Sequence, residues 1–164
     1  GDAAVGLRTT LPDRGSVLLW YYTRSWYDYQ TIFDNSSDAD LWEMWIYRDG
    51  RLRFRNDPKA STLSHPFHPT GDVNEWHHVA VTWEDADQPD ATDCLYVNGL
   101  LVQSVTRKRD ASLKPGQLFF LGGGNSGNSK GNGRWDDVAC FDIPLTANDI
   151  QAMMMDGVET VYEH

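Results

Sequence analysis

Short stretches in which apolar and polar residues alternate follow one another along most of the chain. They are rich in β-branched and aromatic side chains, and residues typical of turns separate them. Alternation with a period of two predicts strands that bury one face, and a series of such strands favours an antiparallel β-sandwich. We expect ten strands, at residues 3–10, 16–24, 29–33, 41–47, 51–55, 77–83, 94–97, 100–105, 117–121 and 134–141.

Two dipeptides predict tight turns between these strands. Asp49-Gly50 and Asn98-Gly99 each lie between two predicted strands. Both accept positive φ at the two central positions of a type I′ turn, whose twist matches that of paired strands. Each dipeptide is therefore expected to close a type I′ hairpin.

One helix is expected, in the stretch LTANDIQAMMMDG near the end of the chain. Thr146 can cap the first turn, and Asp149 completes a capping box. Leu145 and Ile150 form a hydrophobic staple, and Gly157 supplies the stop. The apolar face that should pack against the sandwich consists of Ile150, Met153 and Met154.

The alternation also assigns a face to the adjacent histidines in the stretch EWHHVAVTW. If Val79, Val81 and Trp83 point inward, His78 points outward. Neighbours on a strand face opposite ways, so His77 and His78 cannot share one two-histidine metal site. The aspartates that follow are expected to form a solvated loop, because Asp is a natural turn residue.

Composition limits the classes of partner. We expect a single domain over residues 1–164, which is long enough to enclose its own core. The net charge is −10 and nothing resembles a basic stripe, which argues against nucleic acid and anionic membranes as partners. Nineteen Asp stand against five Glu. This bias suits turns between strands and leaves calcium binding as an option.

The two cysteines, Cys94 and Cys140, exclude a disulfide-rich scaffold and a cysteine zinc site. Their spacing leaves open whether they pair. No apolar run reaches transmembrane length and no signal peptide is recognised. We expect the chain to come from a larger or processed polypeptide.

The order of motifs resembles one known group of proteins. EWHHVAVTW is followed by LYVNGLLV, then LFFLGGG, then GRWDDVACFDIPLTANDIQAMM, and GSVLLWYYTRSW comes early in the chain. This order is similar to the laminin-G-like and pentraxin branch of the concanavalin A-like lectin/glucanase superfamily. The resemblance implies an all-β jelly roll of two curved antiparallel sheets, one with a concave face, and a short C-terminal helix. It also implies a secreted protein that binds carbohydrate.

The superfamily includes glycosidases, so the resemblance by itself is compatible with catalysis. Glucanases of the group carry a Glu-x-Asp-x-x-Glu motif on one strand, whereas Glu43 is the only acidic residue on its predicted strand. No nucleophile elbow or helical His-Glu-x-x-His motif is present. We therefore expect a noncatalytic module, with an unrecognised lyase or hydrolase as the less favoured alternative.

Seven Trp, seven Tyr and six Phe are more rings than one core of this size hides easily. Glu43 should not be buried unpaired, so its side of the strand is expected to be open. A flat ring beside polar groups complements a sugar, and Arg favours acidic or sulfated sugars. Cover by the helix or by residues 26–33 would instead make these rings core. We predict one concave carbohydrate-binding face of Trp20, Tyr22, Glu43, Trp45, Tyr47, Arg53 and His78.

The resemblance also implies a structural calcium ion. In many relatives the Asp that opens the Asp-Asp-Val strand is a ligand, which corresponds to Asp136, with Asp2 as a possible partner. The predicted ligand is a polysaccharide or other glycan. The alternative is a protein-interaction or adhesion domain of a larger extracellular protein, with residues 34–40 and 122–133 as contact loops.

Overall fold

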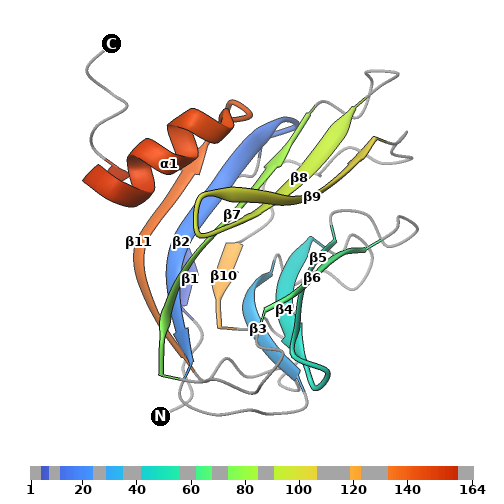
Figure 1. Ribbon diagram of the computed structural model, residues 1–164, viewed down its shortest axis with the longest axis vertical. Helices are drawn as coiled ribbons and strands as arrows, with labels where there is room; N and C mark the ends of the chain where they lie inside the picture. Colours follow the sequence, from blue (N-terminus) through green and yellow to red (C-terminus); the bar gives the residue numbers. More distant parts are fainter. Residues whose placement is uncertain are drawn as a thin grey trace.

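The computed structural model describes residues 5–7, 12–23, 29–34, 42–55, 62–67, 74–84, 91–106, 119–122 and 133–158. Two antiparallel sheets face each other, and one helix lies outside them (Figure 1). The strands are β1 (Val5–Leu7), β2 (Gly15–Thr23), β3 (Tyr29–Asp34), β4 (Glu43–Tyr47), β5 (Arg51–Arg55), β6 (Leu63–Pro66), β7 (Trp76–Trp83), β8 (Thr92–Val97), β9 (Leu100–Thr106), β10 (Phe119–Leu121) and β11 (Gly133–Phe141), and the helix is α1 (Ala147–Asp156).

The strand order confirms the predicted jelly-roll sandwich. One sheet has six strands in the order β1-β10-β3-β4-β5-β6, and the other has five in the order β11-β2-β7-β8-β9. Each of the ten predicted strands has a counterpart. The prediction missed β6, which among the described strands pairs with β5 alone, at the edge of the sheet. Its sequence, LSHP, ends in a proline, which is tolerated at a sheet edge but carries no strand signal.

The core lies between the two sheets and is built around stacked aromatic rings. Trp42, next to β4, stacks on Phe33 of β3 with ring centroids 4.8 Å apart. It also meets Trp83 of β7 edge to face at 5.2 Å, which joins the two sheets. Val79, Val81 and Trp83 point inward, as predicted. The same alternation places seven further core residues on the inner faces of β2, β4 and β5: Val17, Leu19, Tyr21, Met44, Ile46, Leu52 and Phe54.

Of the two predicted type I′ hairpins, one is confirmed and one is wrong. Asn98 and Gly99 have φ of 49° and 75°, as a type I′ turn requires. Between β4 and β5 the loop has three residues, and only Gly50 has positive φ, at 72°. The Gly50 amide donates to the Tyr47 carbonyl at 2.8 Å, which places Arg48 and Asp49 at the turn's central positions. Both side chains therefore project from the tip of the hairpin.

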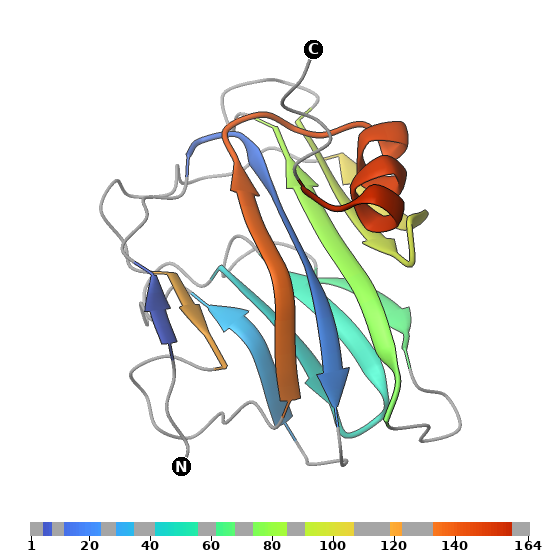
Figure 2. The same cartoon turned by 90° about the vertical axis from the view of Figure 1, so that its left-hand side faces the viewer.

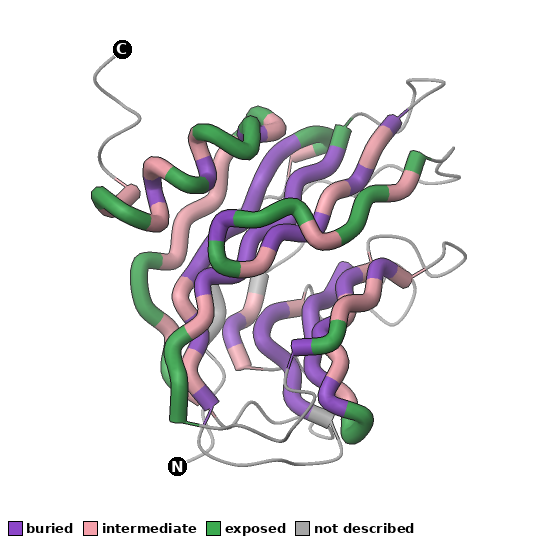
Figure 3. Tube along the Cα trace, in the orientation of Figure 1, coloured by how far each residue is buried: buried purple, intermediate pink, exposed green. Residues whose placement is uncertain are grey.

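Helix α1 has the predicted caps and packs on the outer face of the five-stranded sheet. Thr146 and Asp149 form the capping box. Ile150 and Met153 are buried against Leu18, Ala80 and Tyr96 of the sheet, with Leu145 in the same cluster. Figure 2 shows the helix over one end of this sheet, and the exposed side of the helix is green in Figure 3. No helix in the described part of the chain is long and apolar enough to span a membrane.

Both cysteines are free thiols. Cys140 of β11 packs towards the core between the sheets, whereas Cys94 of β8 lies with the cluster under α1. Burial raises the pKa of Cys140 to about 11. The two thiols therefore act as small apolar side chains, which resolves the open question of a disulfide.

The adjacent histidines point to opposite faces of β7, as predicted. The His77 ring contacts the core residue Phe67 with centroids 4.5 Å apart, whereas the His78 ring meets Trp20 at 5.3 Å on the outer face. Burial lowers the pKa of His77, and it lowers the pKa of His78 to about 4. Both rings are therefore neutral at physiological pH.

We predict that Trp83→Ala destabilises the protein by about 3–5 kcal/mol, because it removes a fully buried ring that joins the two sheets. The midpoint of urea unfolding measures this cost. The matched control is Met155→Ala on the helix, where the side chain is 77% exposed. It should change stability by less than about 0.5 kcal/mol. Equal costs for the two variants would contradict the assigned core.

We predict that the free energy of unfolding falls as the pH drops from about 6.5 towards 4. In this range the His78 ring binds a proton in the unfolded chain but stays neutral in the folded protein, because burial lowers its pKa to about 4. The share of His78 is on the order of 3 kcal/mol at low pH. His65 and His77 have lowered pKa values and act in the same direction. Urea unfolding of wild type and His78→Phe across this pH range should show a shallower slope for the variant. Identical slopes would contradict the buried neutral histidine.

Candidate functional site

The seven residues predicted for one sugar-binding face divide between two faces. Glu43, Trp45, Tyr47 and Arg53 lie on the outer face of the six-stranded sheet. Trp20, Tyr22 and His78 lie on the outer face of the five-stranded sheet. Because the sheets pack through their inner faces, these two outer faces point in opposite directions (Figure 1). The prediction of a single shared face is therefore wrong.

The centre of the six-stranded face is closed. Glu43 and Trp45 are each only 7% exposed, so the expectation that both face open solvent is wrong. Glu43 forms an ion pair with Arg55, which lies directly opposite it on β5. The Arg55 guanidinium also lies 5.4 Å from the Trp45 ring centroid. A partner of opposite charge on the next strand makes burial of the carboxylate tolerable, and the alternation within one strand does not reveal such a partner.

A second carboxylate lies beside Glu43. Asp34 of β3 is its register partner, so the two side chains share the outer face. Directly opposite residues of antiparallel strands have Cβ atoms about 5 Å apart. The glucanase motif places its carboxylates on one strand, whereas these two lie on neighbouring strands, so the sequence of a single strand does not reveal them. The chain thus holds two acids and Arg55 together, although it lacks the glucanase motif.

The Tyr47 ring is in contact with two arginine side chains of the protein. Arg53 has its guanidinium carbon 4.8 Å from the ring centroid, and that of Arg48 lies at 5.3 Å. Each contact is a cation–π interaction with the ring face. The faces that a sugar would stack on are therefore in contact with the protein's own cations.

The five-stranded sheet presents a different surface, which we call the aromatic patch: Trp20, Tyr22, Trp76, Arg134 and Asp136. Register pairs Tyr22 with both Trp76 and Arg134, and it pairs Trp20 with Asp136. The patch lies where β2 ends and β7 and β11 begin, away from α1 (Figure 2). Trp76 is 42% exposed, and its ring is tilted against Tyr22 with centroids 5.4 Å apart.

Polar groups surround the rings of the aromatic patch. Arg134 and Asp136 are exposed, and the Arg134 guanidinium lies 5.7 Å from the Tyr22 ring centroid. The Tyr22 hydroxyl donates to the Asn74 side-chain oxygen at 3.1 Å. The patch thus combines an open indole ring with a cation, a carboxylate and an amide, which are the groups that hydrogen-bond sugar hydroxyls.

His78 lies beneath Trp20 rather than on the open surface. It is only 1% exposed, and its two ring nitrogens have no hydrogen-bond partner among the described residues. The buried His78 ring therefore cannot contact a sugar as predicted. Its neighbour on the same face, Trp76, was missed as a site residue. Residues two apart on a strand share a face, so Trp76 lies on the same side of β7 as His78. Its position at the first residue of β7 explains its exposure.

The predicted calcium ligands do not form a site within the described residues. Asp136 is exposed, and one of its carboxylate oxygens accepts from the Asp137 amide at 3.1 Å. Asp2 lies outside the described residues. Within the described ranges, no group of three or more His, Cys, Asp or Glu could hold a metal ion. The calcium ion stays a prediction.

The two loops proposed for partner contact fall largely outside the described part of the chain. Only Asp34 of the first loop and residues 122 and 133 of the second are described. The adhesion alternative therefore has no surface assigned to it by the structure.

Several solved structures share this fold. A native heptameric SAP-like pentraxin from Limulus polyphemus matches with a TM-score of 0.70 and 18% identity, over 92% of this chain and 75% of the pentraxin chain. The botulinum neurotoxin serotype D ligand binding domain, in complex with N-acetylneuraminic acid, gives 0.73 and 19%, over 93% and 39%. Botulinum neurotoxin type C, described as dependent on two ganglioside molecules for cell entry, gives 0.71 and 16%, over 93% and 39%.

These neighbours establish the architecture and no more, because their identities are low. The chain spans about two-fifths of each toxin chain, at 39%. The serotype D structure is named as a ligand binding domain, whereas the superfamily also includes glucanases. Comparison with curated proteins finds no match.

A match to a family model assigns the chain to a family, which the similarity to solved structures does not do. A laminin-G-like model, described as the Concanavalin A-like lectin/glucanases superfamily, matches residues 3–151. The match runs through both sheets and into α1. It includes the motifs on which the resemblance was based, except for the last three residues of the final motif. The chain therefore belongs to the concanavalin A-like lectin/glucanases superfamily.

Proposed function

We propose that this protein is a noncatalytic carbohydrate-binding domain that docks a glycan on the aromatic patch. The observation that carries the proposal is the open indole ring of Trp76, 42% exposed at the end of a sheet and bordered by polar side chains. The C–H face of a pyranose would stack on Trp76. Arg134, Asp136 and Asn74 would hydrogen-bond its hydroxyls.

The aromatic patch is favoured over the six-stranded face because of what each ring already contacts. Trp45 is buried, and Tyr47 is held by two arginines. Trp76, by contrast, contacts Tyr22 on one side and has 42% of its surface exposed. Stacking on a sugar would bury apolar area that the fold leaves exposed, at a gain of roughly 25 cal/mol per Å².

Family membership supports this class of ligand. The superfamily is that of lectins and glucanases, and two structural neighbours are described with N-acetylneuraminic acid or gangliosides. Since this chain matches only 39% of each toxin chain, these ligands indicate a class and do not locate a site. A secreted location and a place within a larger multidomain protein remain part of the proposal.

We predict that Trp76→Ala weakens glycan binding by about thirtyfold or more, since truncation of a central aromatic contact that dominates binding costs about 2 kcal/mol or more. Calorimetry against neutral and acidic polysaccharides identifies the ligand and measures the loss. The melting temperature should change little, because Trp76 is half exposed and lies outside the core cluster.

The matched control is Ile143→Ala, a substitution at an apolar residue that is 47% exposed and lies outside the patch. It should leave glycan affinity unchanged. Equal affinity of wild type and Trp76→Ala for every bound glycan would refute the patch as the site. Binding to no glycan would favour the adhesion alternative. Release of reducing sugar, abolished by Asp34→Asn or Glu43→Gln, would instead identify a hydrolase that uses the acid pair.

We predict that glycan binding at the aromatic patch does not require calcium, since Arg134, Asn74 and the rings supply the contacts themselves. The affinity should be the same with and without a chelator. Calcium bound elsewhere would appear as a rise in melting temperature when the ion is restored, because a ligand of the folded state stabilises it. Loss of binding in chelator, restored by calcium and removed by Asp136→Asn, would make the ion part of this site.

A further inference from the structure

The hairpin between β4 and β5 carries a concentration of arginines in an acidic protein. Arg48, Arg51, Arg53 and Arg55 lie within eight residues, whereas the whole chain has 14 basic and 24 acidic side chains. The three nearest the turn lie on or beside the outer face of the six-stranded sheet. With Asp49 they form what we call the hairpin arginine cluster: Arg48, Asp49, Arg51 and Arg53.

Asp49 organises this cluster. Both of its carboxylate oxygens accept from the Arg53 guanidinium, at 3.2 and 2.6 Å, and one also accepts from the Arg51 amide at 3.2 Å. Burial raises the pKa of Asp49, but these hydrogen bonds and the charges of Arg53 and Arg51 outweigh it, and the pKa lies below its ordinary value. The carboxylate is therefore ionised and neutralises one of the three guanidinium groups.

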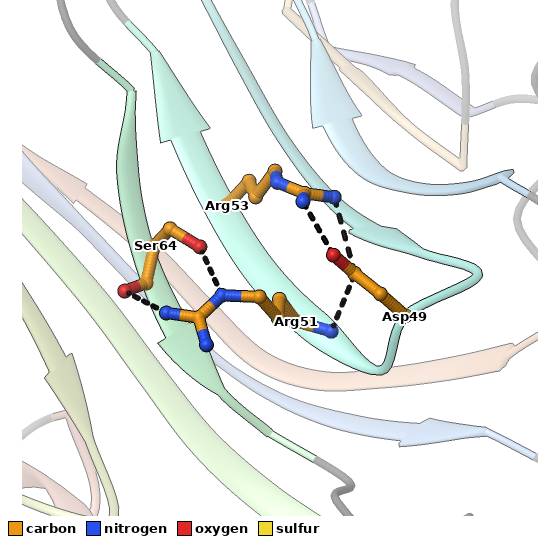
Figure 4. A network of polar contacts seen from close by, with 4 residues as sticks. All are labelled: Asp49, Arg51, Arg53 and Ser64. Atoms are coloured by element: carbon orange, nitrogen blue, oxygen red, sulfur yellow. Dashed lines mark hydrogen bonds and ion pairs between the residues drawn. The ribbon is translucent and has the colours of Figure 1, made fainter.

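The other two guanidinium groups keep an uncompensated charge. The Arg51 side chain reaches away from Asp49 and donates to the Ser64 hydroxyl and carbonyl, at 2.7 and 3.0 Å (Figure 4). Both acceptors are neutral. Arg48 is exposed at the turn and lies against the Tyr47 ring. Neither Arg48 nor Arg51 forms an ion pair within the described residues.

The cluster is pre-organised by its neighbours. Tyr47 holds Arg48 and Arg53, while Ser64 fixes the Arg51 guanidinium by two hydrogen bonds. Each guanidinium has five N–H donors, so Arg51 retains donors on the side away from Ser64, and Arg48 retains all of its own. Fixed guanidinium groups lose less entropy when they bind an anion.

We propose that the hairpin arginine cluster binds the anionic group of an acidic saccharide, a carboxylate or a sulfate, through Arg48 and Arg51. The planar guanidinium matches two oxygens of such a group with parallel hydrogen bonds. The anionic part of the proposal rests on the hairpin, whereas the saccharide part rests on the proposed function. This surface lies on the side of the sandwich opposite the aromatic patch and is a second, chemically distinct site.

The overall negative charge does not prevent such binding at physiological salt. With a net charge of −10 the protein repels polyanions at long range. At 0.15 M ionic strength the Debye length is about 8 Å, so an anion at the hairpin interacts mainly with the groups that touch it. Those groups have an excess of positive charge.

The test measures binding of a sulfated glycosaminoglycan, polygalacturonate and a neutral glucan by calorimetry in 0.15 M salt. Arg48→Gln should weaken binding of at least one polyanion by about tenfold, the value of one charge-assisted contact, and should leave the neutral glucan unaffected. The control Arg14→Gln removes the same charge at an exposed position elsewhere and should have no effect. The two polyanions separate sulfate from carboxylate recognition.

A second variant should increase affinity. Asp49→Asn keeps a side-chain oxygen for the Arg51 amide but frees the Arg53 guanidinium from its carboxylate. Polyanion binding should become about two- to fivefold tighter, the range for one surface charge pair. The control Asp142→Asn removes an exposed carboxylate far along the chain and should not tighten binding. If the cluster only stabilised the hairpin, Asp49→Asn would not increase the affinity for either polyanion.

The outcomes separate the two sites. Binding of neither polyanion, equal losses for Arg48→Gln and Arg14→Gln, or no gain for Asp49→Asn would each overturn the hairpin proposal. A neutral glucan that binds wild type but not Trp76→Ala would leave the aromatic patch standing in that case. Conversely, polyanion binding that depends on Arg48 but is unaffected by Trp76→Ala would uphold the hairpin cluster alone.

Discussion

The packing of the two sheets through Trp42, Phe33 and Trp83 is the constraint on which the rest of the molecule depends. These rings close the space between the sheets, and no polar side chain of the predicted site lies among them. The space between the sheets is therefore filled, and the two sites proposed here use the outer faces and the hairpin beside them. Because the two outer faces point in opposite directions, side chains that share the outward position of the alternation do not necessarily share a site.

The two outer faces use the same residue types in opposite ways. On the six-stranded sheet, arginines contact Trp45 and Tyr47, so the rings hold cations in place. On the five-stranded sheet, α1 covers the row of Leu18, Ala80 and Tyr96 and leaves the next rows to the aromatic patch. One face is thus suited to charge and the other to the apolar surface of a sugar.

Much of the fold was predictable because its signals are local. Alternation predicted ten strands and the inward residues, and the capping box predicted α1. The failures are non-local. Alternation does not determine which sheet a strand joins. The outward residues of both sheets were therefore assigned to a single binding face, although they lie on two. Burial of Glu43 depends on Arg55 across the hairpin, and exposure of Trp76 depends on where the helix stops covering the sheet. The turn at Gly50 was mistaken because one extra loop residue changes the turn type.

Whether an aromatic ring can bind a sugar depends on its neighbours more than on its position in a strand. Tyr47 and Trp76 both lie at a strand end and both face outward. Tyr47 is followed by a turn that brings Arg48 back onto the ring, and β5 adds Arg53. Trp76 begins its strand, and its described ring contact is Tyr22 alone. The arginines of the hairpin thus occupy the Tyr47 ring. The Trp76 ring, at the first residue of β7, stays exposed and can stack on a sugar.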